Sequence, residues 1–142
     1  MRAGFFMAYD VRGVYGQDIN ERVFEQIGKA FGTFLAKKRI RECFIARDNR
    51  PSSNSLKKSF SFGLASAGIS ARDLGIASNP IAFYAMLCNP STGGAIVTAS
   101  HNPSEYNGVK FYYNNSQLKP GEVEQVKKNF LEKNLVQRLP QQ

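Results

Sequence analysis

The clearest periodic pattern of apolar residues lies in the first third of the chain. These residues recur at three- and four-residue spacing, which places them along one face of a helix. Asn20 precedes the pattern and has a side chain suited to a helix N-cap. We therefore predict a helix from Asn20 to about Arg39. Its buried face would consist of Val23, Phe24, Ile27, Phe31, Phe34 and Leu35.

Short apolar runs alternate with helical patterns along most of the chain. This alternation predicts a mainly parallel sheet with helices on both faces. The expected fold is a three-layer α/β/α arrangement around a mainly parallel, mixed sheet. Two further helices are predicted over 54–66, where Gly68 would follow the end, and over 79–87, where Pro80 lies in the first turn. The candidate strands are Phe5–Asp10, Cys43–Ala46, Ile69–Leu74 and Gly94–Thr98.

The last third of the chain departs from this alternation. Tyr106-Asn107-Gly108 predicts a turn, because Asn-Gly is a strong turn dipeptide. The extended segment Val109–Tyr113 follows the previous strand so closely that antiparallel pairing is expected, and Glu122–Asn134 is predicted as the last helix. We expect one domain over residues 1–136 and a linker or tail over 137–142.

Composition and charge narrow the possible partners. Of the 142 residues, 42% are hydrophobic and 21% charged, which is typical of a globular domain. The net charge of +8 favours anionic ligands such as phosphorylated metabolites. The one dense basic cluster, Lys37–Arg41, lies where a helix should end, and cations there complement the helix dipole. We therefore predict no nucleic-acid partner.

The cysteines and the longest apolar runs bear on the cellular compartment. Cys43 and Cys88 lie far apart, without a metal-ligand or Cys-x-x-Cys spacing, and we interpret them as reduced, packed thiols. No apolar stretch reaches membrane-spanning length, and Met1–Met7 lacks the features of a signal peptide. The prediction is a cytoplasmic protein without a membrane partner.

Polar segments follow three of the predicted strands. Ligands of open α/β sheets collect at the carboxyl ends of the strands, so these segments are the candidate site. Each segment carries groups suited to a phosphorylated ligand. The groups are Tyr9, Asp10 and Arg12 in the first, Arg47, Asp48 and Arg50 in the second, and Ser100, His101 and Asn102 in the third.

The third segment, Thr98–Pro103, has the sharpest chemical pattern. A serine hydroxyl exposed there could accept a phosphoryl group, given a cation to balance the charge and a group to move the proton. His101 is adjacent to Ser100 and is the only histidine of the chain. Lys110 follows the expected turn at Asn107-Gly108 and could return toward the same edge. Alternatively, Ser100 could merely cap a turn, His101 could brace the loop and Lys110 could be an ordinary exposed lysine.

The hexapeptide Thr-Ala-Ser-His-Asn-Pro at 98–103 resembles the phosphoserine loop of the α-D-phosphohexomutase superfamily, the phosphoglucomutase and phosphomannomutase enzymes. The resemblance continues in order along residues 5–135. Two departures are Ala46, where the family often has Gly, and Ser78-Asn79-Pro80, where it often has Thr-Pro. The further matching segments are Phe6–Gly13, Ala46–Ser53, Asp73–Gly75 and Tyr106–Phe111.

The resemblance implies an isomerase that interconverts hexose 1-phosphate and 6-phosphate through a hexose bisphosphate. Ser100 would be the phosphoserine, and its phosphate oxygen would be one ligand of Mg²⁺. His101 would handle a proton and Lys110 would stabilise charge. Tyr9, Arg12 and Lys110 would line the substrate cleft, although Arg12 could instead brace its own segment through Asp10 or backbone carbonyls. Arg47, Asp48, Arg50 and Asn102 would form a supporting scaffold.

Members of this family have four domains, and the chain resembles only the first. No Asp-x-Asp-x-Asp pattern is present, and Mg²⁺ normally takes more than one oxygen ligand from the protein. The metal loop, the sugar-recognition loop and the phosphate clamp belong to the other domains, so we expect these domains as partners and no turnover by the chain alone. The alternative is a non-catalytic module that binds sugar phosphates or another protein.

Overall fold

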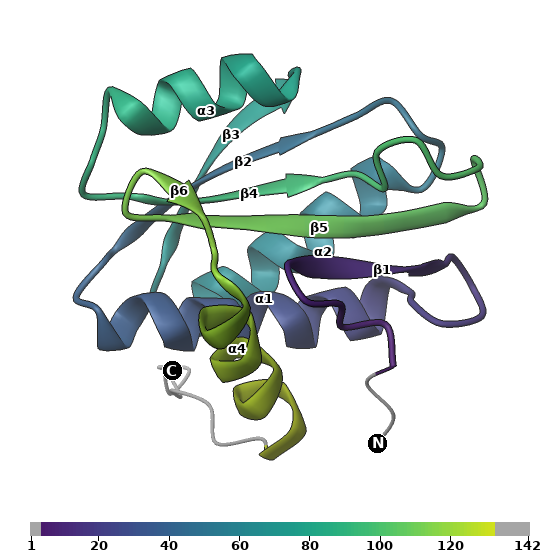
Figure 1. Ribbon diagram of the computed structural model, residues 1–142, viewed down its shortest axis with the longest axis horizontal. Coiled ribbons are helices and arrows are strands. Elements are labelled where there is room, and N and C mark those ends of the chain that lie inside the picture. Colours follow the sequence, from purple (N-terminus) through teal and green to yellow (C-terminus); the bar gives the residue numbers. More distant parts are fainter. Residues whose placement is uncertain (1–3, 133–142) are drawn as a thin grey trace.

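The computed structural model describes residues 4–132 as an alternating series of strands and helices (Figure 1). The series follows the predicted order of strands and helices, with one added short strand near the end. The strands are β1 (Asp10–Val14), β2 (Glu42–Arg47), β3 (Ser70–Ile76), β4 (Gly93–Val97), β5 (Tyr106–Tyr113) and β6 (Ser116–Gln117). The helices are α1 (Glu21–Lys37), α2 (Ser53–Ser66), α3 (Asn79–Leu87) and α4 (Pro120–Glu132).

The strands form one mixed sheet in the order β1-β5-β4-β2-β3, with β6 paired to β5. Strands β2, β3 and β4 pair in parallel, whereas β5 is antiparallel to both β4 and β1. It follows that β1 runs parallel to β4, and β5 is inserted between them. The prediction of a mainly parallel, mixed sheet is confirmed, as is the antiparallel pairing of the segment after β4.

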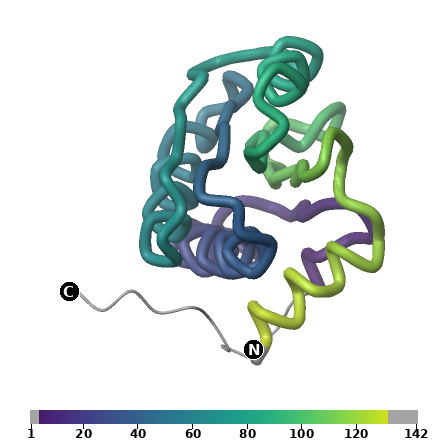
Figure 2. The backbone as a smooth tube through the Cα atoms, turned by 90° about the vertical axis from the view of Figure 1, so that its left-hand side faces the viewer, coloured from purple at the N-terminus to yellow at the C-terminus, as the bar shows by residue number. Residues whose placement is uncertain are grey.

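Helices cover both faces of the sheet, which confirms the predicted three-layer arrangement. In Figure 1, α1, α2 and α4 lie on one side of the sheet and α3 lies on the other. Figure 2 shows the same layers from the side. The larger core lies between the sheet and α1, α2 and α4, and the smaller one lies beneath α3. Helix α3 contacts β2 and β4, and its Phe83 packs against Tyr112 of β5. Within residues 4–132, no helix covers this face of β1 or of the β5 residues paired with β1 (Figure 1).

The first helix forms as its sequence pattern predicts. The Asn20 side chain accepts a hydrogen bond from the backbone N–H of Val23 at 2.9 Å and so caps α1. The apolar stripe is buried, with Val23 at its margin. Ser78, one residue before α3, likewise accepts from the N–H of Ile81, and Pro80 lies in the first turn. These local signals explain why the predicted and observed helices agree closely.

The expected turn at Asn107-Gly108 is wrong, because both residues lie inside β5. Asn107 is fully buried, and Gly108 pairs with Arg12 across the β1–β5 ladder. A side chain at Gly108 would place its Cβ 1.9 Å from the Val11 carbonyl oxygen. The glycine is therefore required for close approach of two strands rather than for a turn.

The predicted first strand is displaced along the chain. Phe5 and Phe6 are buried, but their segment folds back on β1, where Phe6 bridges to Val11 and the Met7 N–H donates to the Asp10 carbonyl. The strand proper, β1, begins at Asp10 and alternates a buried Val11 with Asp10 and Arg12 on the other face. The apolar run ahead of Asp10 therefore suggested a strand several residues before the true one, in which charged Asp10 and Arg12 alternate with Val11 and Gly13.

The remaining predictions concern the two cysteines, the tail and membrane-spanning segments. Cys43 is buried, which raises the pKa of its thiol, but Cys88 is exposed, so the prediction of a packed thiol is wrong there. The predicted tail at 137–142 lies outside the described residues. Among residues 4–132, no helix has the length and apolar character needed to cross a membrane.

Candidate functional site

The segment after β4 is a tight loop at the carboxyl edge of the sheet. Its entry is held by the Thr98 N–H, which donates to the Gly108 carbonyl at 2.9 Å. Ser100 has a φ of 57°, in the left-handed region that residues other than glycine rarely adopt. The Ser100 N–H donates to the Thr98 hydroxyl at 3.0 Å, and Ser100 itself is half-buried. The loop therefore presents its serine in a defined backbone conformation at the rim.

Arg50 holds this loop through its backbone carbonyls. One terminal nitrogen donates to the carbonyls of Ser100 at 2.8 Å and Asn102 at 2.9 Å. The other donates to the carbonyls of Pro103 at 2.7 Å and Tyr106 at 3.0 Å. With Nε also bonded, to Asp48, every N–H of the guanidinium is engaged, so none is left for a ligand.

Asp48 fixes Arg50 and is itself strongly hydrogen-bonded. Its carboxylate accepts from Arg50 Nε at 3.0 Å, from the Arg50 backbone N–H at 3.1 Å and from the Ser53 hydroxyl at 2.5 Å. Burial on its own would raise the pKa of the Asp48 carboxyl. Hydrogen bonds from Ser53, Thr98 and Arg50 outweigh burial and lower that pKa, so the carboxylate is charged at neutral pH.

Arg12 reaches the same loop from β1. Its guanidinium donates to the Asn102 side-chain oxygen at 2.9 Å and forms an ion pair with Asp10 at 2.7 Å. Both contacts use the terminal nitrogens, and the buried Nε atom has no partner within the described part of the chain. The Arg12 side chain remains 31% exposed, so solvent and small anions can still approach it. Binding to Asp10 is the bracing alternative raised from the sequence, whereas the contact with Asn102 was not foreseen.

Lys110 lies on β5 between the two strands that flank it. It pairs with Asp10 of β1 and with Ile96 of β4, one residue before β4 ends. Opposed residues of a strand pair point to the same face, and so do residues two apart on one strand. Lys110 and Arg12 therefore share the face of β1 and of the paired part of β5 that no helix covers among residues 4–132, next to the start of the serine loop.

The other predicted site residues are less constrained. His101 is exposed beside Ser100. Tyr9 immediately precedes β1 and its side chain is 55% exposed, while its backbone carbonyl accepts from Gln117. Arg47, the last residue of β2, donates to the Asp48 carbonyl at 3.1 Å, and its buried Nε has no partner among residues 4–132. Thus Tyr9 and His101 lie at the surface, and Arg47 lies behind the loop.

Three residues behind the loop were missed in the sequence. Asn107 donates from its side-chain nitrogen to the hydroxyls of Ser52 at 2.8 Å and Ser53 at 2.9 Å. Asn107 is fully buried, so these bonds join the start of β5 to the start of α2 out of contact with solvent. The Ser-Ser pair ahead of the helix was a usable signal, but the interpretation of Asn107 as a turn residue concealed its partners.

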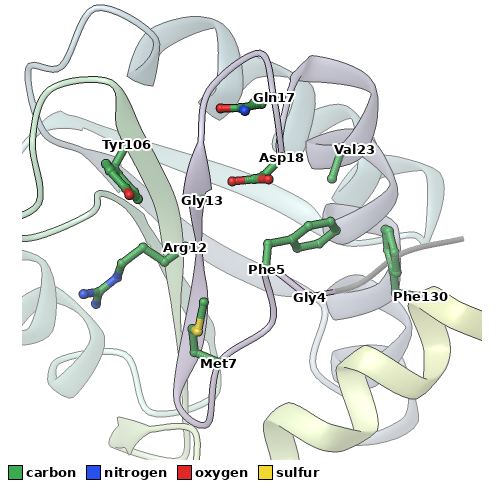
Figure 3. A pocket seen from close by; sticks show the side chains of 10 residues that line it. All are labelled: Gly4, Phe5, Met7, Arg12, Gly13, Gln17, Asp18, Val23, Tyr106 and Phe130. Carbon is green, nitrogen blue, oxygen red and sulfur yellow. The ribbon is translucent and has the colours of Figure 1, made fainter.

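A cavity of about 550 Å³ lies alongside β1, and Arg12 is among its lining residues, although its guanidinium points away from Phe5, Asp18 and Phe130 (Figure 3). Its walls include the rings of Phe5 and Phe130 and the carboxylate of Asp18, which accepts from the Val14 N–H. Aromatic rings and a carboxylate do not favour a phosphate group. The cationic face beside the serine loop is therefore the better anion site.

A metal site in the protein needs several donor side chains close together. Over residues 4–132, no three His, Cys, Asp or Glu side chains gather as a metal site would require. The carboxylates of Asp10 and Asp48 are each engaged by an arginine. These residues do not by themselves fit a Mg²⁺ ion, which needs several oxygen ligands.

The fold is an α/β/α domain with a mixed sheet. The Ser100 loop lies at the carboxyl edge of this sheet, and Arg12 contacts the loop through Asn102. Residues 4–137 match the family described as phosphoglucomutase/phosphomannomutase, alpha/beta/alpha domain I. Because the match covers most of the sequence, the chain belongs to this family.

Individual relatives agree with this assignment. The phosphomannomutase of Escherichia coli strain K12 is 40% identical over 105 residues, 74% of this chain and 22% of that protein. A Thermococcus gammatolerans protein named "Probable phosphoglucosamine mutase" is 31% identical over 136 residues, 96% of this chain and 30% of that protein. A phosphoglucomutase/phosphomannomutase family protein of Burkholderia thailandensis superposes with a TM-score of 0.89 at 28% identity, over 96% of this chain and 32% of its own. The chain thus spans less than a third of each.

Proposed function

We propose that Ser100 carries the phosphoryl group in a phosphohexomutase that interconverts hexose 1-phosphate and hexose 6-phosphate. The observation that supports this most is the loop itself, in which Arg50 holds four backbone carbonyls around the half-buried Ser100 and Arg12 contacts Asn102, two residues further on. Phosphoryl transfer depends chiefly on positioning and on balancing charge, and this arrangement supplies both.

The reaction consists of two transfers with opposite direction. In the first, the bond between Ser100 Oγ and phosphorus breaks, a sugar hydroxyl loses its proton and bonds to that phosphorus, and Ser100 takes up a proton. The hexose bisphosphate then turns over within the site. In the second, its other phosphoryl group bonds to Ser100 Oγ, the serine proton leaves and the freed sugar oxygen gains one.

The neighbouring side chains have separate tasks in these transfers. Lys110 and Arg12 balance the negative charge of the phosphoryl oxygens from the uncovered face of β5 and β1. His101, exposed beside Ser100, moves the proton between the serine and the sugar oxygen. Tyr9 lines the cleft in which the hexose phosphate binds. Arg47, Asp48, Arg50 and Asn102 hold the loop and do not touch the sugar.

Mg²⁺ and the remaining mutase domains complete the site. A phosphate oxygen on Ser100 is the only ligand we assign to this chain, and a Mg²⁺ ion held there would supply positive charge to the transferred group. Further metal ligands, sugar contacts and a phosphate clamp come from domains beyond the one matched here. Since a single oxygen does not hold Mg²⁺ firmly, the chain alone should show no turnover.

A fusion protein tests the proposal. The full chain is followed by the part of the E. coli phosphomannomutase that lies beyond its matching segment, and we refer to this protein as the mutase fusion. We expect it to interconvert mannose 1-phosphate and mannose 6-phosphate, whereas the Ser100→Ala fusion and the unfused chain do not. Ser104→Ala removes a hydroxyl four residues away and should retain activity. Activity in the Ser100→Ala fusion would contradict the assignment.

A further inference from the structure

A chain of hydrogen bonds, buried at Asn107 and partly buried from Asp48 onward, connects β5 to the serine loop. It begins at Asn107, which donates to Ser53 at 2.9 Å, and continues from the Ser53 hydroxyl to the Asp48 carboxylate at 2.5 Å. From Asp48 it passes to Arg50 and then to the carbonyls of the loop, including that of Ser100. The first and last links, from Asn107 to Ser53 and from Arg50 to the Ser100 carbonyl, join residues far apart in the sequence, so the chain exists only in the folded domain.

The direction of these bonds is determined by the chemistry of the groups. A serine hydroxyl has one proton, and Ser53 donates it to a carboxylate that can only accept. Its remaining contact must therefore be with a donor, and the Asn107 amide nitrogen is one. The Asn107 oxygen accepts from the Gly108 N–H at 2.9 Å, which fixes the orientation of the amide. Aspartate at 107 could not donate in this way.

The loop needs such support because its backbone is strained. A non-glycine residue at a φ of 57° costs about 1–2 kcal/mol relative to ordinary conformations. Arg50 offsets this through the carbonyls it engages, but only while Asp48 keeps its guanidinium in place. Asp48 in turn accepts a hydrogen bond from the Ser53 hydroxyl, and that hydroxyl oxygen accepts one from Asn107.

We propose that Asn107 is a positioning residue for the Ser100 loop, acting through Ser53 and Asp48 on Arg50. It touches neither the loop serine nor the face that carries Lys110 and Arg12. The inference rests on the proposed function for its catalytic meaning, because positioning matters only if Ser100 reacts. Its structural content can be tested without any sugar phosphate.

The test is a double-substitution cycle in the full chain, with the hydrogen exchange of the Arg50 Nε–H measured by NMR. Asn107→Ala and Ser53→Ala should each raise the exchange rate about tenfold, the factor expected for one lost hydrogen bond. In the Ser53→Ala background, Asn107→Ala should change the rate by less than about twofold, because the path is already cut. Ser55→Ala is the matched control, since this hydroxyl donates to Glu21 at 2.6 Å and so lies outside the path through Ser53 and Asp48.

Two results would overturn the inference. One is an Arg50 exchange rate in Asn107→Ala within about twofold of the unchanged chain. The other is an effect of Asn107→Ala that is equally large with and without Ser53, which would indicate a general loosening of the fold. If Asn107→Ala does not fold, Asn107→Asp takes its place, because a carboxylate cannot donate to Ser53, and it should raise the Arg50 exchange rate to the same extent.

The mutase fusion adds a readout that links the loop to the reaction. Asn107→Ala should lower kcat about tenfold and leave KM for mannose 1-phosphate unchanged, because Asn107 orients the serine and does not contact the sugar. A rise in KM at unchanged kcat would contradict the positioning role. An inactive parent fusion would count against the proposed function, whereas the NMR cycle would still decide the hydrogen-bond path.

Discussion

At the scale of single residues, Arg50 is the side chain on which the loop depends most. A guanidinium presents its N–H groups in a rigid plane, and here all of them are used by four loop carbonyls and one carboxylate. A lysine ammonium has three donors and no planar fork, so it cannot reproduce this arrangement. The sequence motif around Arg50 suggested a scaffold, and its contacts explain how one side chain can hold a strained serine.

Replacing Arg50 with lysine should therefore destabilise the chain. At about 1 kcal/mol for each of two or three lost hydrogen bonds, the free energy of unfolding should fall by about 2–3 kcal/mol, as measured by urea denaturation. Arg72→Lys is the control, because the Arg72 side chain is 53% exposed and its ion pair with Glu42 is long, at 3.7 Å. This substitution should change the free energy of unfolding by less than about 0.5 kcal/mol. Equal effects of the two substitutions would contradict the role of Arg50.

The lowered pKa of Asp48 makes part of the stability dependent on pH. A carboxyl with a folded-state pKa below its unfolded value of about 3.9 stabilises the fold above that pH, and the contribution is lost as pH falls through the folded pKa. Asp48→Asn should lower the free energy of unfolding at pH 7 by about 2 kcal/mol and flatten its decline below about pH 4. Urea denaturation across this range measures both. If the free energy of unfolding of Asp48→Asn declined below about pH 4 as steeply as that of the unchanged chain, Asp48 would not be the source of this pH dependence.

At the scale of elements, the contact between α1 and α2 is closer than the sequence pattern suggested. A Cβ added at Gly63 would lie 2.0 Å from the Glu25 carbonyl oxygen, and one at Gly28 would lie 2.2 Å from that of Phe60. The two helices therefore approach backbone to backbone at these glycines. Glycine inside a helix lowers helix stability, so the sequence alone gives no reason for these glycines, and the close packing of the two helices explains them.

Gly63→Ala sets helix propensity against this packing. Alanine favours the helix by about 1 kcal/mol, but the clash with backbone that cannot rotate away should cost more. We expect a net loss of about 2 kcal/mol in the free energy of unfolding, measured by urea denaturation. Gly121→Ala in α4 is the matched control, because a Cβ there meets nothing within 4 Å. A stabilised Gly63→Ala chain would show that the helices can separate freely.

Elements whose signals are local were predicted well, and those that depend on distant partners were not. The α1 stripe, its Asn20 cap and the Pro80 helix start needed only neighbouring residues. Asn107-Gly108 has the composition of a turn, yet the pairing with β1 and the bonds to Ser53 draw it into β5. The loop that carries Ser100 was located correctly, but the left-handed backbone and the hydrogen-bond path behind it arise only from long-range contacts.

At the scale of the whole molecule, the alternating pattern was sufficient for the α/β/α architecture. It did not predict that β5 inserts between β1 and β4, which brings Arg12 and Lys110 to one uncovered face. That face lies beside the serine loop, and the matched relatives extend well beyond the segment shared with this chain.

The most direct test of the account is the site of phosphorylation. The mutase fusion is incubated with a hexose 1,6-bisphosphate and Mg²⁺, and its intact mass and proteolytic peptides are measured before and after phosphatase treatment. We expect a gain of one phosphoryl group on the peptide that contains Ser100. Phosphatase should remove this group, and the Ser100→Ala fusion should not acquire it. A phosphoryl group carried by another residue in an active fusion, with Ser100 unmodified, would contradict the account.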